Sequence, residues 1–565
     1  MVLAWPTAAE PAGSFRYAWV VWSWAFWSRL PRLTGPFFRT LCALIAAMLL
    51  AAELGVKKHY GTWLDARMIR ATTEAWDDVK ASLVSMLPMY ALASFLFFVV
   101  LFALSRGMKQ SKAPLRTAVT LALLTSMAWR YGAVAPPDAR LVRSAFAWSE
   151  LRGGGALSAS AELPDAPTAK KRLPHVMLII TESIRAADAC GVHGRSCTTQ
   201  KDIDTEMQDR IGFPAGYSLA SYTLVSVATM LEGKVPMSQE RPPQLFDYLM
   251  HVQGGRVEVA YFGTHAAEVI SRQSTASKIP TFVSLENFHR GSIDDEDLLL
   301  SEANDAKLIP LVRDYARAHR DKPTFSVVHF SGTHAPYYVN EDVTPFTPWT
   351  HRASWATLAP LHNAYKNAIV MQDRTTAELL RAFKQEHAGE PWVIIYTSDH
   401  GEAFGEHNGI HHGQNVYDEQ THVPFWIAQG GDALSAEEAE HLRAYTQQAV
   451  THADVTPTVL DLFGVLDALP WARARAGFQG RSLLRSPRPL GLLPATNCTP
   501  LFTCPLANWG VMAEGKKLLA QPWDADWRCV KSPSDVALAE GECAELRAAS
   551  RGWFATLPDG KANTK

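Results

Sequence analysis

An apolar run, Pro391–Ile395, leads directly into the segment Tyr396-Thr-Ser-Asp-His-Gly-Glu402. This pattern predicts a buried strand that ends in an Asp-His pair, so that Asp399 and His400 lie where the strand stops and a loop begins. In α/β sheets, ligands bind in the crevice beyond the carboxyl ends of the strands. A carboxylate beside an imidazole at that place is a plausible pair of metal ligands. Taken alone, the same pair is equally compatible with an ordinary loop turn.

Short apolar runs alternate with helical patterns from residue 175 onward. Such alternation predicts an α/β domain with a mostly parallel central sheet and helices on both of its faces. The expected core strands are His175–Thr181, Val257–Gly263, Phe325–Ser331, Trp392–Ser398 and Pro424–Gln429. The expected helices include Leu224–Leu231, Glu302–His319 and Ala364–Glu386.

The first 134 residues have the composition of a membrane domain, followed by a linker over 135–173 and a catalytic domain over 174–565. Three apolar runs are expected to form transmembrane helices: Thr40–Gly55 extended by Phe37 and Phe38, Ser82–Ser105, and Thr117–Trp129 extended to Val134. The Trp-rich run Tyr17–Trp27 is too short for a confident span and is expected to lie in the membrane interface. Arginine and lysine clusters before the first span and between the second and third belong in the cytoplasm. Three spans then place the rest of the chain on the far side, and the expected location is a bacterial inner membrane with the catalytic domain in the periplasm. If Tyr17–Trp27 also spans, the side changes and conflicts with the disulfides expected below.

Six of the seven cysteines fall into close pairs, Cys190 with Cys197, Cys498 with Cys504, and Cys529 with Cys543. Paired cysteines that follow a membrane domain favour disulfides in an oxidising compartment, and zinc sites formed by the cysteine pairs are the alternative. The formal net charge of -2 lacks the basic surplus of a general nucleic-acid binder, so no nucleic-acid partner is expected.

Glu182 repeats the arrangement of Asp399, since it follows the expected strand His175–Thr181 directly. Two strand-end carboxylates and a histidine suit Zn²⁺ or Mn²⁺ better than a metal that prefers thiolates. Thr223 begins an expected helix, where the helix dipole stabilises anions. Metal coordination would lower the pKa of its hydroxyl and make it a nucleophile, although a threonine at a helix start is more often only a cap.

Two further histidines follow expected strands. His334 lies in Ser331-Gly-Thr-His-Ala-Pro336, and His412 lies in Asn408-Gly-Ile-His-His-Gly413. Either imidazole could protonate a leaving oxygen or hold phosphate oxygens. A single loop histidine is more often incidental, so these assignments depend on the other motifs found in the same chain.

Together these motifs resemble the alkaline phosphatase superfamily, and more narrowly its membrane-anchored phosphoethanolamine transferases that modify lipid A. Lipoteichoic acid synthase and the sulfatases are relatives within that superfamily. The matching stretches keep their order along the chain: Thr181-Glu-Ser-Ile-Arg185, Thr223 with Ser226 and Met230, Gly332-Thr-His-Ala-Pro-Tyr-Tyr338, Tyr365-Lys-Asn-Ala-Ile369 with Asp373, Ser398-Asp-His-Gly-Glu402 and Asp418-Glu-Gln-Thr-His-Val-Pro424.

The resemblance implies a role for each matching residue. Glu182, Thr223, Asp399 and His400 would bind one metal ion, usually zinc in the transferases, with Mn²⁺ or Mg²⁺ as alternatives. His334 and His412 would contact the phosphoryl group or a second metal, and His422 also matches a family position. Glu74, in the outward loop Val56–Ala81, matches a substrate-contacting acid. The family's Asn and Thr near that acid are replaced here by Ala66 and Arg70, so recognition of the head group is expected to differ.

The implied function is transfer of phosphoethanolamine from the phospholipid phosphatidylethanolamine to lipid A or another surface glycan through a phosphorylated Thr223. The enzyme is expected to act as a monomer. A phosphoglycerol transferase or a phosphodiesterase on the same scaffold is the alternative. A sulfatase fits less well, because Leu-Val-Ser-Val after Thr223 lacks the Pro and Arg of the formylglycine motif. A third hypothesis, an inactive membrane-tethered binding protein, would not require all four metal positions to be filled.

Overall fold

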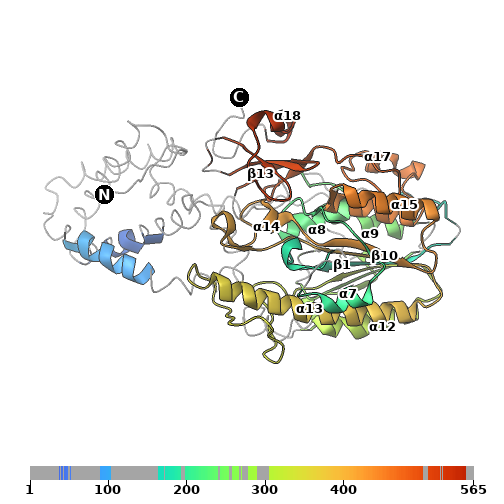
Figure 1. The fold of residues 1–565 in the computed structure, drawn as a ribbon, viewed down its shortest axis with the longest axis horizontal. Coiled ribbons are helices and arrows are strands. Elements are labelled where there is room, and N and C mark those ends of the chain that lie inside the picture. The colour runs from blue at the N-terminus through green and yellow to red at the C-terminus, as the bar shows by residue number, and fades with distance from the viewer. Residues whose placement is uncertain are drawn as a thin grey trace. The chain divides into compact units, whose positions relative to one another are not determined.

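The computed structural model of the chain (Figure 1) describes residues 37, 40–41, 43–48, 51–52, 90–103, 163–170, 172–191, 198–238, 242–252, 257–265, 269, 278–288, 305–499, 507–521, 524 and 526–554. The chain divides into two compact units. The first comprises residues 1–155 with 520–527 and 554–565, and the second comprises residues 156–519 with 528–553. Every candidate site residue except Glu74 belongs to the second unit.

The described part of the first unit is mostly helical. Residues 37, 40–41, 43–48, 51–52 and 90–103 are in helices, and these positions fall within the first two expected spans. No helix formed by the described residues has both the length and the apolar character needed to cross a membrane. The other expectations for this region lie outside the described residues, namely the Trp-rich run Tyr17–Trp27, the loop Val56–Ala81 with Glu74, and the third span Thr117–Trp129.

A seven-stranded sheet forms the centre of the second unit, in the order β2-β10-β7-β1-β6-β4-β5. Strands β7, β1, β6, β4 and β5 run parallel. Strand β10 pairs antiparallel with both β7 and β2. The strands are β1 (His175–Thr181), β2 (Ile211–Gly212), β4 (Glu258–Gly263), β5 (Thr281–Val283), β6 (Thr324–His329), β7 (Trp392–Ser398) and β10 (Phe425–Gly430).

All five predicted core strands are therefore present, and the mostly parallel sheet is confirmed. The antiparallel direction of β10 was not predicted. Parallel neighbours need a crossover connection, usually a helix that spans one face of the sheet. In the segment between β7 and β10, the one α-helix is the short α14 (Asp418–Thr421), which is too short to cross the sheet. The chain therefore returns beside β7 in the opposite direction.

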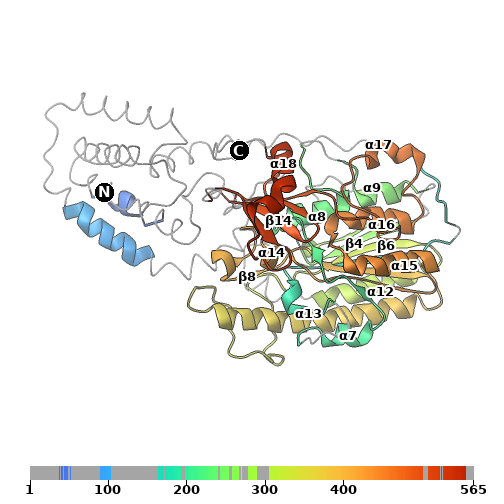
Figure 2. The same ribbon diagram turned by 45° about the horizontal axis from the view of Figure 1, so that its top comes forward.

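Helices cover both faces of this sheet (Figures 1 and 2). One face carries α8 (Thr223–Glu232), α9 (Leu245–Met250), α15 (Ala436–Ala444) and α16 (Val455–Leu462). The other carries α7 (Lys201–Glu206), α12 (Leu308–Ala318) and α13 (Leu358–Glu386). The three predicted helices correspond to α8, α12 and α13.

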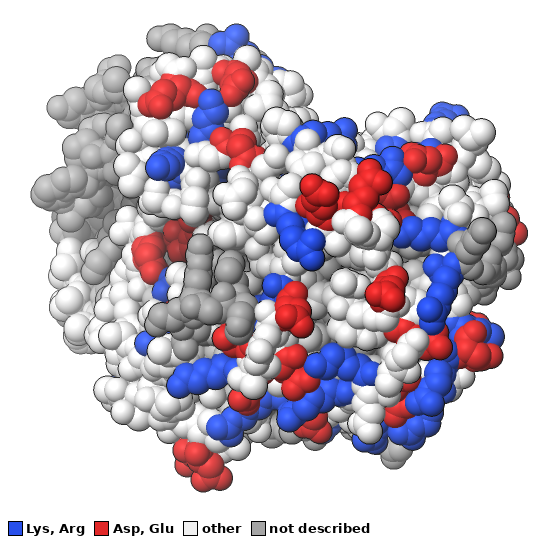
Figure 3. Space-filling model, turned by 45° about the vertical axis from the view of Figure 1, so that its right-hand side comes forward, with Lys and Arg blue, Asp and Glu red and all other residues white. Residues whose placement is uncertain are grey.

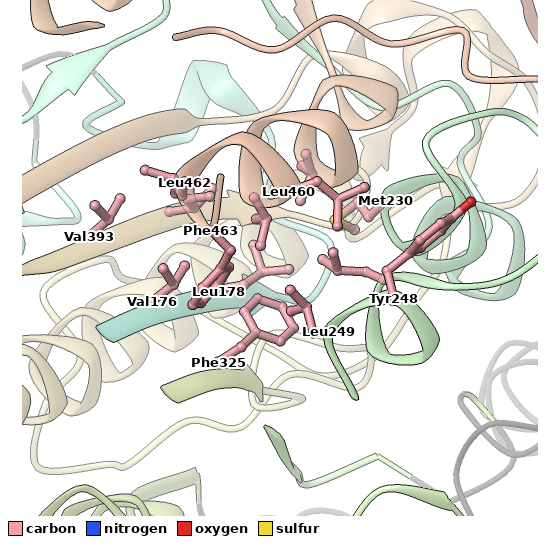
Figure 4. Packing of buried hydrophobic residues seen from close by; sticks show 14 of the residues in the cluster. Val176, Leu178, Met230, Tyr248, Leu249, Phe325, Val393, Leu460, Leu462 and Phe463 are labelled. Carbon is pink, nitrogen blue, oxygen red and sulfur yellow. The ribbon is translucent and has the colours of Figure 1, made fainter. Parts of the chain in front are cut away.

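The central strand β1 is apolar on both sides because both of its faces are covered. Its alternate residues Val176, Leu178 and Ile180 belong to the core beneath α8, α9 and α16, which Figure 4 shows at close range. Met177 and Ile179 point to the opposite core, beneath α7, α12 and α13. Such continuous apolar strands are typical of parallel sheets that are buried on both sides.

The tail of the second unit adds a separate four-stranded sheet made of β12 (Leu493–Ala495), β13 (Trp509–Ala513), β14 (Lys516–Ala520) and β15 (Arg528–Lys531). A disulfide between Cys529 and Cys543 links β15 to the segment before α18 (Ala544–Trp553), which confirms one predicted pair. Cys190 and Cys498 are also in disulfides, while their expected partners, Cys197 and Cys504, lie outside the described residues. The remaining short elements are β3 (Gly216–Tyr217), β8 (Ala403–Phe404), β9 (Ile410–His411), β11 (Val450–Thr451) and α17 (Ala472–Arg475).

Positive and negative side chains are interspersed on the face that Figure 3 shows. Ion pairs recur in the second unit, and Glu386 accepts hydrogen bonds from both Arg317 at 2.7 Å and Arg320 at 2.8 Å. Such local pairing compensates charges rather than building a field of one sign.

Two stacked histidines lie at the edge of the sheet where β1 begins. The rings of His175 and His387 are 3.8 Å apart, and both residues are buried. Burial lowers the pKa of His175 to about 4, and burial together with His175 lowers the pKa of His387 to about 3. Both rings are therefore neutral in the folded protein at neutral pH.

These histidines predict a loss of stability in mild acid. A histidine whose folded pKa lies below its unfolded value costs stability as the pH falls, because only the unfolded chain takes up the proton. The cost begins near pH 6.5 and grows by about 1.4 kcal/mol per pH unit for each ring until the folded pKa is reached. We expect His387→Phe to reduce the drop in melting temperature between pH 7 and pH 5, measured on the full-length protein. The control is His251→Phe, at a ring that is 39% exposed, and an equal drop in wild type and His387→Phe would contradict this account.

Candidate metal centre and active site

The carboxyl ends of four parallel strands meet at one edge of the sheet, and each is followed by residues able to bind a ligand. Glu182 follows β1, and Asp399 and His400 follow β7. The loop that carries His334 follows β6, and His265 lies two residues beyond β4. Helix α8 begins at Thr223 near the same edge, since the Thr223 hydroxyl lies 3.2 Å from the His400 ring. The prediction that Thr223 begins a helix is confirmed.

The four predicted metal ligands converge around one atom, Nε2 of His400. This nitrogen lies 3.2 Å from Thr223 Oγ1, 3.3 Å from Glu182 Oε1 and 3.2 Å from Asp399 Oδ2. Glu182, Asp399 and His400 are fully buried, whereas Thr223 is partly exposed. Thr223 therefore lies on the more exposed side of the cluster.

The donor atoms fit a divalent cation. Oδ2 of Asp399 and Oε2 of Glu182 are buried and accept no hydrogen bond from any described residue, which is costly for carboxylates. Nδ1 of His400 lies 3.0 Å from the carbonyl oxygen of Gly401. If Nδ1–H donates to that carbonyl, Nε2 keeps its lone pair and faces the oxygens, as in histidines that bind metals.

Burial and the neighbouring Asp399 raise the pKa of Glu182 to about 7. Burial also acts to raise the pKa of Asp399, but His400, His329 and the backbone amide of Ser183 outweigh it, and the pKa lies below its usual value. The negative charges of two neighbouring buried carboxylates repel each other, and the surrounding groups do not fully offset that repulsion. Such a pair favours binding of a cation between them.

Hydrogen bonds hold Asp399 in place from two directions. Its Oδ1 accepts from the amides of Ser183 at 2.9 Å and His400 at 2.7 Å, and its carbonyl accepts from the hydroxyl of Ser226 on α8. Ser226 also lies 3.0 Å from Nδ1 of the buried His452. Since Ser226 is one helical turn after Thr223, this network fixes the start of α8 against the end of β7.

His334 and His412 line the partly exposed side of the cluster. The rings of His400 and His412 are 4.3 Å apart, and those of His412 and His334 are 5.3 Å apart. Glu182, His334 and His412 each offer a ligand atom, and these atoms lie within 4.8 Å of one another. Nδ1 of His412 lies 3.3 Å from Glu402 Oε1, which orients the ring. Both histidines are therefore placed where they could meet a phosphoryl group or share a second ion with Glu182.

The loop that carries His334 is anchored by a residue that the sequence did not single out. Asp305 accepts hydrogen bonds from the amides of Ser331 at 3.1 Å and Gly332 at 2.9 Å. Thr333 donates to the carbonyl of Glu182 at 2.5 Å. The loop is thus fixed to the edge of the sheet where Glu182 lies.

Two predicted site residues, His422 and Glu74, are not among the described residues that cluster around His400. Nε2 of His422 lies 2.8 Å from the carbonyl of Pro214, and the ring stacks on Tyr217 at 5.1 Å. These contacts support packing, and a role in substrate binding stays a prediction. Glu74 is outside the described residues. Conversely, His265 and His329 lie beside Glu182, although the sequence analysis did not select them. His265 follows the predicted strand Val257–Gly263 closely, so the pattern that identified Glu182 could have identified it as well. His329 lies inside the predicted strand Phe325–Ser331, and only the structure shows that β6 ends there.

The family model named Sulfatase matches residues 174–465 of the chain. The chain belongs to the sulfatase family. The match begins just before β1 and extends beyond α16, so it includes every strand of the central sheet and the whole cluster around His400. The resemblance inferred from the motifs is therefore confirmed at the level of the family.

Curated relatives of this sulfatase-family chain include phosphatidylethanolamine transferase Mcr-2 of Escherichia coli, which is 30% identical over 174 residues. Phosphoethanolamine transferase EptA of Helicobacter pylori is 27% identical over 167 residues. The aligned part spans about a third of these proteins, 31% of each, and 29% and 28% of this chain.

One solved structure supports the overall fold. The integral membrane lipooligosaccharide phosphoethanolamine transferase A of Neisseria meningitidis gives a TM-score of 0.54 at 16% identity, covering 80% of this chain and 87% of that one. At this identity the similarity concerns the fold alone.

Proposed function

We propose that this protein transfers phosphoethanolamine from phosphatidylethanolamine to lipid A or another surface glycan. The observation that carries the proposal is the position of Thr223, a partly exposed residue at the start of α8. Its hydroxyl lies 3.2 Å from Nε2 of His400, and the same nitrogen lies beside the buried carboxylates of Glu182 and Asp399. The names of the relatives, which are phosphatidylethanolamine or phosphoethanolamine transferases, support the choice of the transferred group.

The cluster would hold one divalent cation through Glu182, Thr223, Asp399 and His400, with Zn²⁺ as first choice and Mn²⁺ or Mg²⁺ as alternatives. Bound there, the cation would lower the pKa of the Thr223 hydroxyl and offset negative charge on the phosphoryl oxygens. The start of α8 adds the positive end of a ten-residue helix to the same place, which also favours the anionic group.

In the first half of the reaction, the Thr223 hydroxyl gives up its proton to solvent, and Oγ1 attacks the phosphorus of the donor lipid. The bond between phosphorus and the diacylglycerol oxygen breaks, and His334 or His412 donates a proton to the leaving oxygen. Phosphoethanolamine is now esterified to Thr223. Both histidines are partly exposed, as this role requires.

In the second half, a hydroxyl or phosphate of the acceptor attacks the same phosphorus, and the bond between phosphorus and Oγ1 of Thr223 breaks. A proton on the acceptor oxygen returns to the histidine, and Thr223 regains its proton from solvent. The two half-reactions share one nucleophile, so ping-pong kinetics are expected. We place the catalytic unit in the periplasm of a bacterial inner membrane, because the donor lipid and lipid A both reside in that membrane before export.

The donor lipid tests the proposal. The full-length protein in detergent is incubated with labelled phosphatidylethanolamine or phosphatidylglycerol, and released diacylglycerol is measured. We expect release from phosphatidylethanolamine at least tenfold faster than from phosphatidylglycerol. A preference for phosphatidylglycerol would replace the proposal with a phosphoglycerol transferase. Hydrolysis of an aryl sulfate with neither lipid cleaved would overturn it in favour of a sulfatase.

A further inference from the structure

A second group of metal-binding side chains lies on the other side of Glu182. It consists of Glu182, His265, just beyond β4, and His329, the last residue of β6. Oε2 of Glu182 is 3.2 Å from Nε2 of His265, and the rings of His265 and His329 are 4.1 Å apart. One ligand atom from each residue lies within 4.8 Å of the other two.

The two oxygens of Glu182 face different partners. Oε1 is directed to the first cluster, where it lies 3.3 Å from His400 and accepts from the Ser183 hydroxyl at 2.9 Å. Oε2 is directed to His265 and accepts no hydrogen bond from the described residues. A carboxylate in this position can bind one cation with each oxygen, as bridging carboxylates do in two-metal sites.

His329 supplies an independent observation. Its side chain is fully buried, and its Nε2 has no hydrogen-bond partner in the described part of the chain. The other ring nitrogen, Nδ1, lies 3.1 Å from the hydroxyl of Tyr261. If Nδ1–H donates to that hydroxyl, Nε2 carries a buried lone pair with nothing to accept, the arrangement in which a second partner orients a metal-binding histidine.

A proton on His265 is the simpler alternative, and it explains only part of the site. Nε2 of His265 lies 3.2 Å from both Glu182 Oε2 and the carbonyl oxygen of Phe330, so an N–H there could donate to either. That arrangement leaves Nε2 of His329 fully buried without a hydrogen-bond partner in the described part of the chain, which is unfavourable for a polar atom. A cation among the three ligand atoms satisfies Glu182 and His329 together.

We propose that Glu182, His265 and His329 form a second metal site that shares Glu182 with the first centre. One carboxylate and two imidazoles are the donors that Zn²⁺ accepts most readily, and Mn²⁺ is the next candidate. The backbone around the site is already fixed, because the amide of Thr264 donates to the His329 carbonyl at 3.1 Å. The second ion neutralises the outer oxygen of Glu182 and so holds the shared ligand in place for the first centre.

Metal content tests this site without reference to turnover. Wild type, His265→Ala and the control His319→Ala are purified as full-length protein, loaded with zinc, dialysed against metal-free buffer and analysed by elemental mass spectrometry. His319 is a suitable control because it is also partly buried but bonds to the Tyr315 carbonyl on α12. We expect His265→Ala to hold one zinc fewer than wild type and His319→Ala. Equal zinc content in all three proteins would overturn the proposal.

A second measurement needs no variant. Crystals of zinc-loaded wild type should give an anomalous difference peak within bonding distance of Glu182 Oε2, His265 and His329. A map with a peak at Thr223, Asp399 and His400 but none at His329 would overturn the second site and leave the proposed transfer reaction intact. Failure of the phosphatidylethanolamine assay would instead count against the proposed function and leave the metal map unaffected.

Discussion

Replacing Thr223 with alanine is expected to lower the rate of phosphoethanolamine transfer by at least about 10³-fold, because removal of a covalent nucleophile leaves only binding and electrostatic effects. The fold should survive, since the Thr223 side chain is partly exposed and sits in the first turn of α8. Thr223→Ser should retain part of the activity, because it keeps a hydroxyl at the same place. The measurement is diacylglycerol release from phosphatidylethanolamine, with the melting temperature recorded for each variant.

The matched control is Thr375→Ala. Thr375 is also a partly exposed helical threonine, and its hydroxyl donates to the Met371 carbonyl on α13. It should keep the wild-type rate. Transfer by Thr223→Ala at a rate within tenfold of this control would remove Thr223 from the mechanism, whatever the stability of the variant.

Treatment with a metal chelator is the second change with a large expected effect. A strong chelator should abolish transfer and lower the melting temperature together, because Glu182 and Asp399 are then left buried and facing each other. A ligand that binds only the folded state stabilises it in proportion to the logarithm of its concentration relative to the dissociation constant, so added Zn²⁺ should restore both properties. Mn²⁺ and Mg²⁺ are tested in the same way to identify the preferred ion.

Asp399→Asn separates metal loss from other effects of the chelator. This variant keeps the shape of the side chain but loses the charge that faces His400, so it should be inactive and its melting temperature should respond less to added zinc. Full activity of wild type after exhaustive chelation, with no zinc detectable by elemental analysis, would contradict a metal-dependent mechanism.

The sequence predicted the site better than its surroundings. Each core strand of the parallel sheet is a short apolar run, and an acidic residue directly follows both β1 and β7. Parallel strands place such residues at one edge of the sheet. The sequence pattern therefore predicted that Glu182, Asp399 and His400 lie close together. The Asp-His pair alone was ambiguous, and it became informative only when Thr223 and the other motifs were found in order along the chain.

Other features depended on contacts that no local pattern encodes. Asp305 holds the His334 loop from a distant segment, and Ser226 reaches the Asp399 carbonyl across the sheet edge. The antiparallel direction of β10 follows from the absence of a crossover helix after β7. His265 lies just beyond a predicted strand and His329 lies inside one, and histidines at such places are often structural. Only their position beside Glu182 in the structure makes them candidate ligands.

The most direct test of the central claim is the mass of the peptide that contains Thr223 after the full-length protein meets phosphatidylethanolamine without an acceptor. The account predicts that this peptide gains the mass of one phosphoethanolamine group, fragmentation places the group on Thr223, and Thr223→Ala lacks it. Diacylglycerol release with the group on another residue, or with no modified peptide in rapidly quenched samples, would contradict the account.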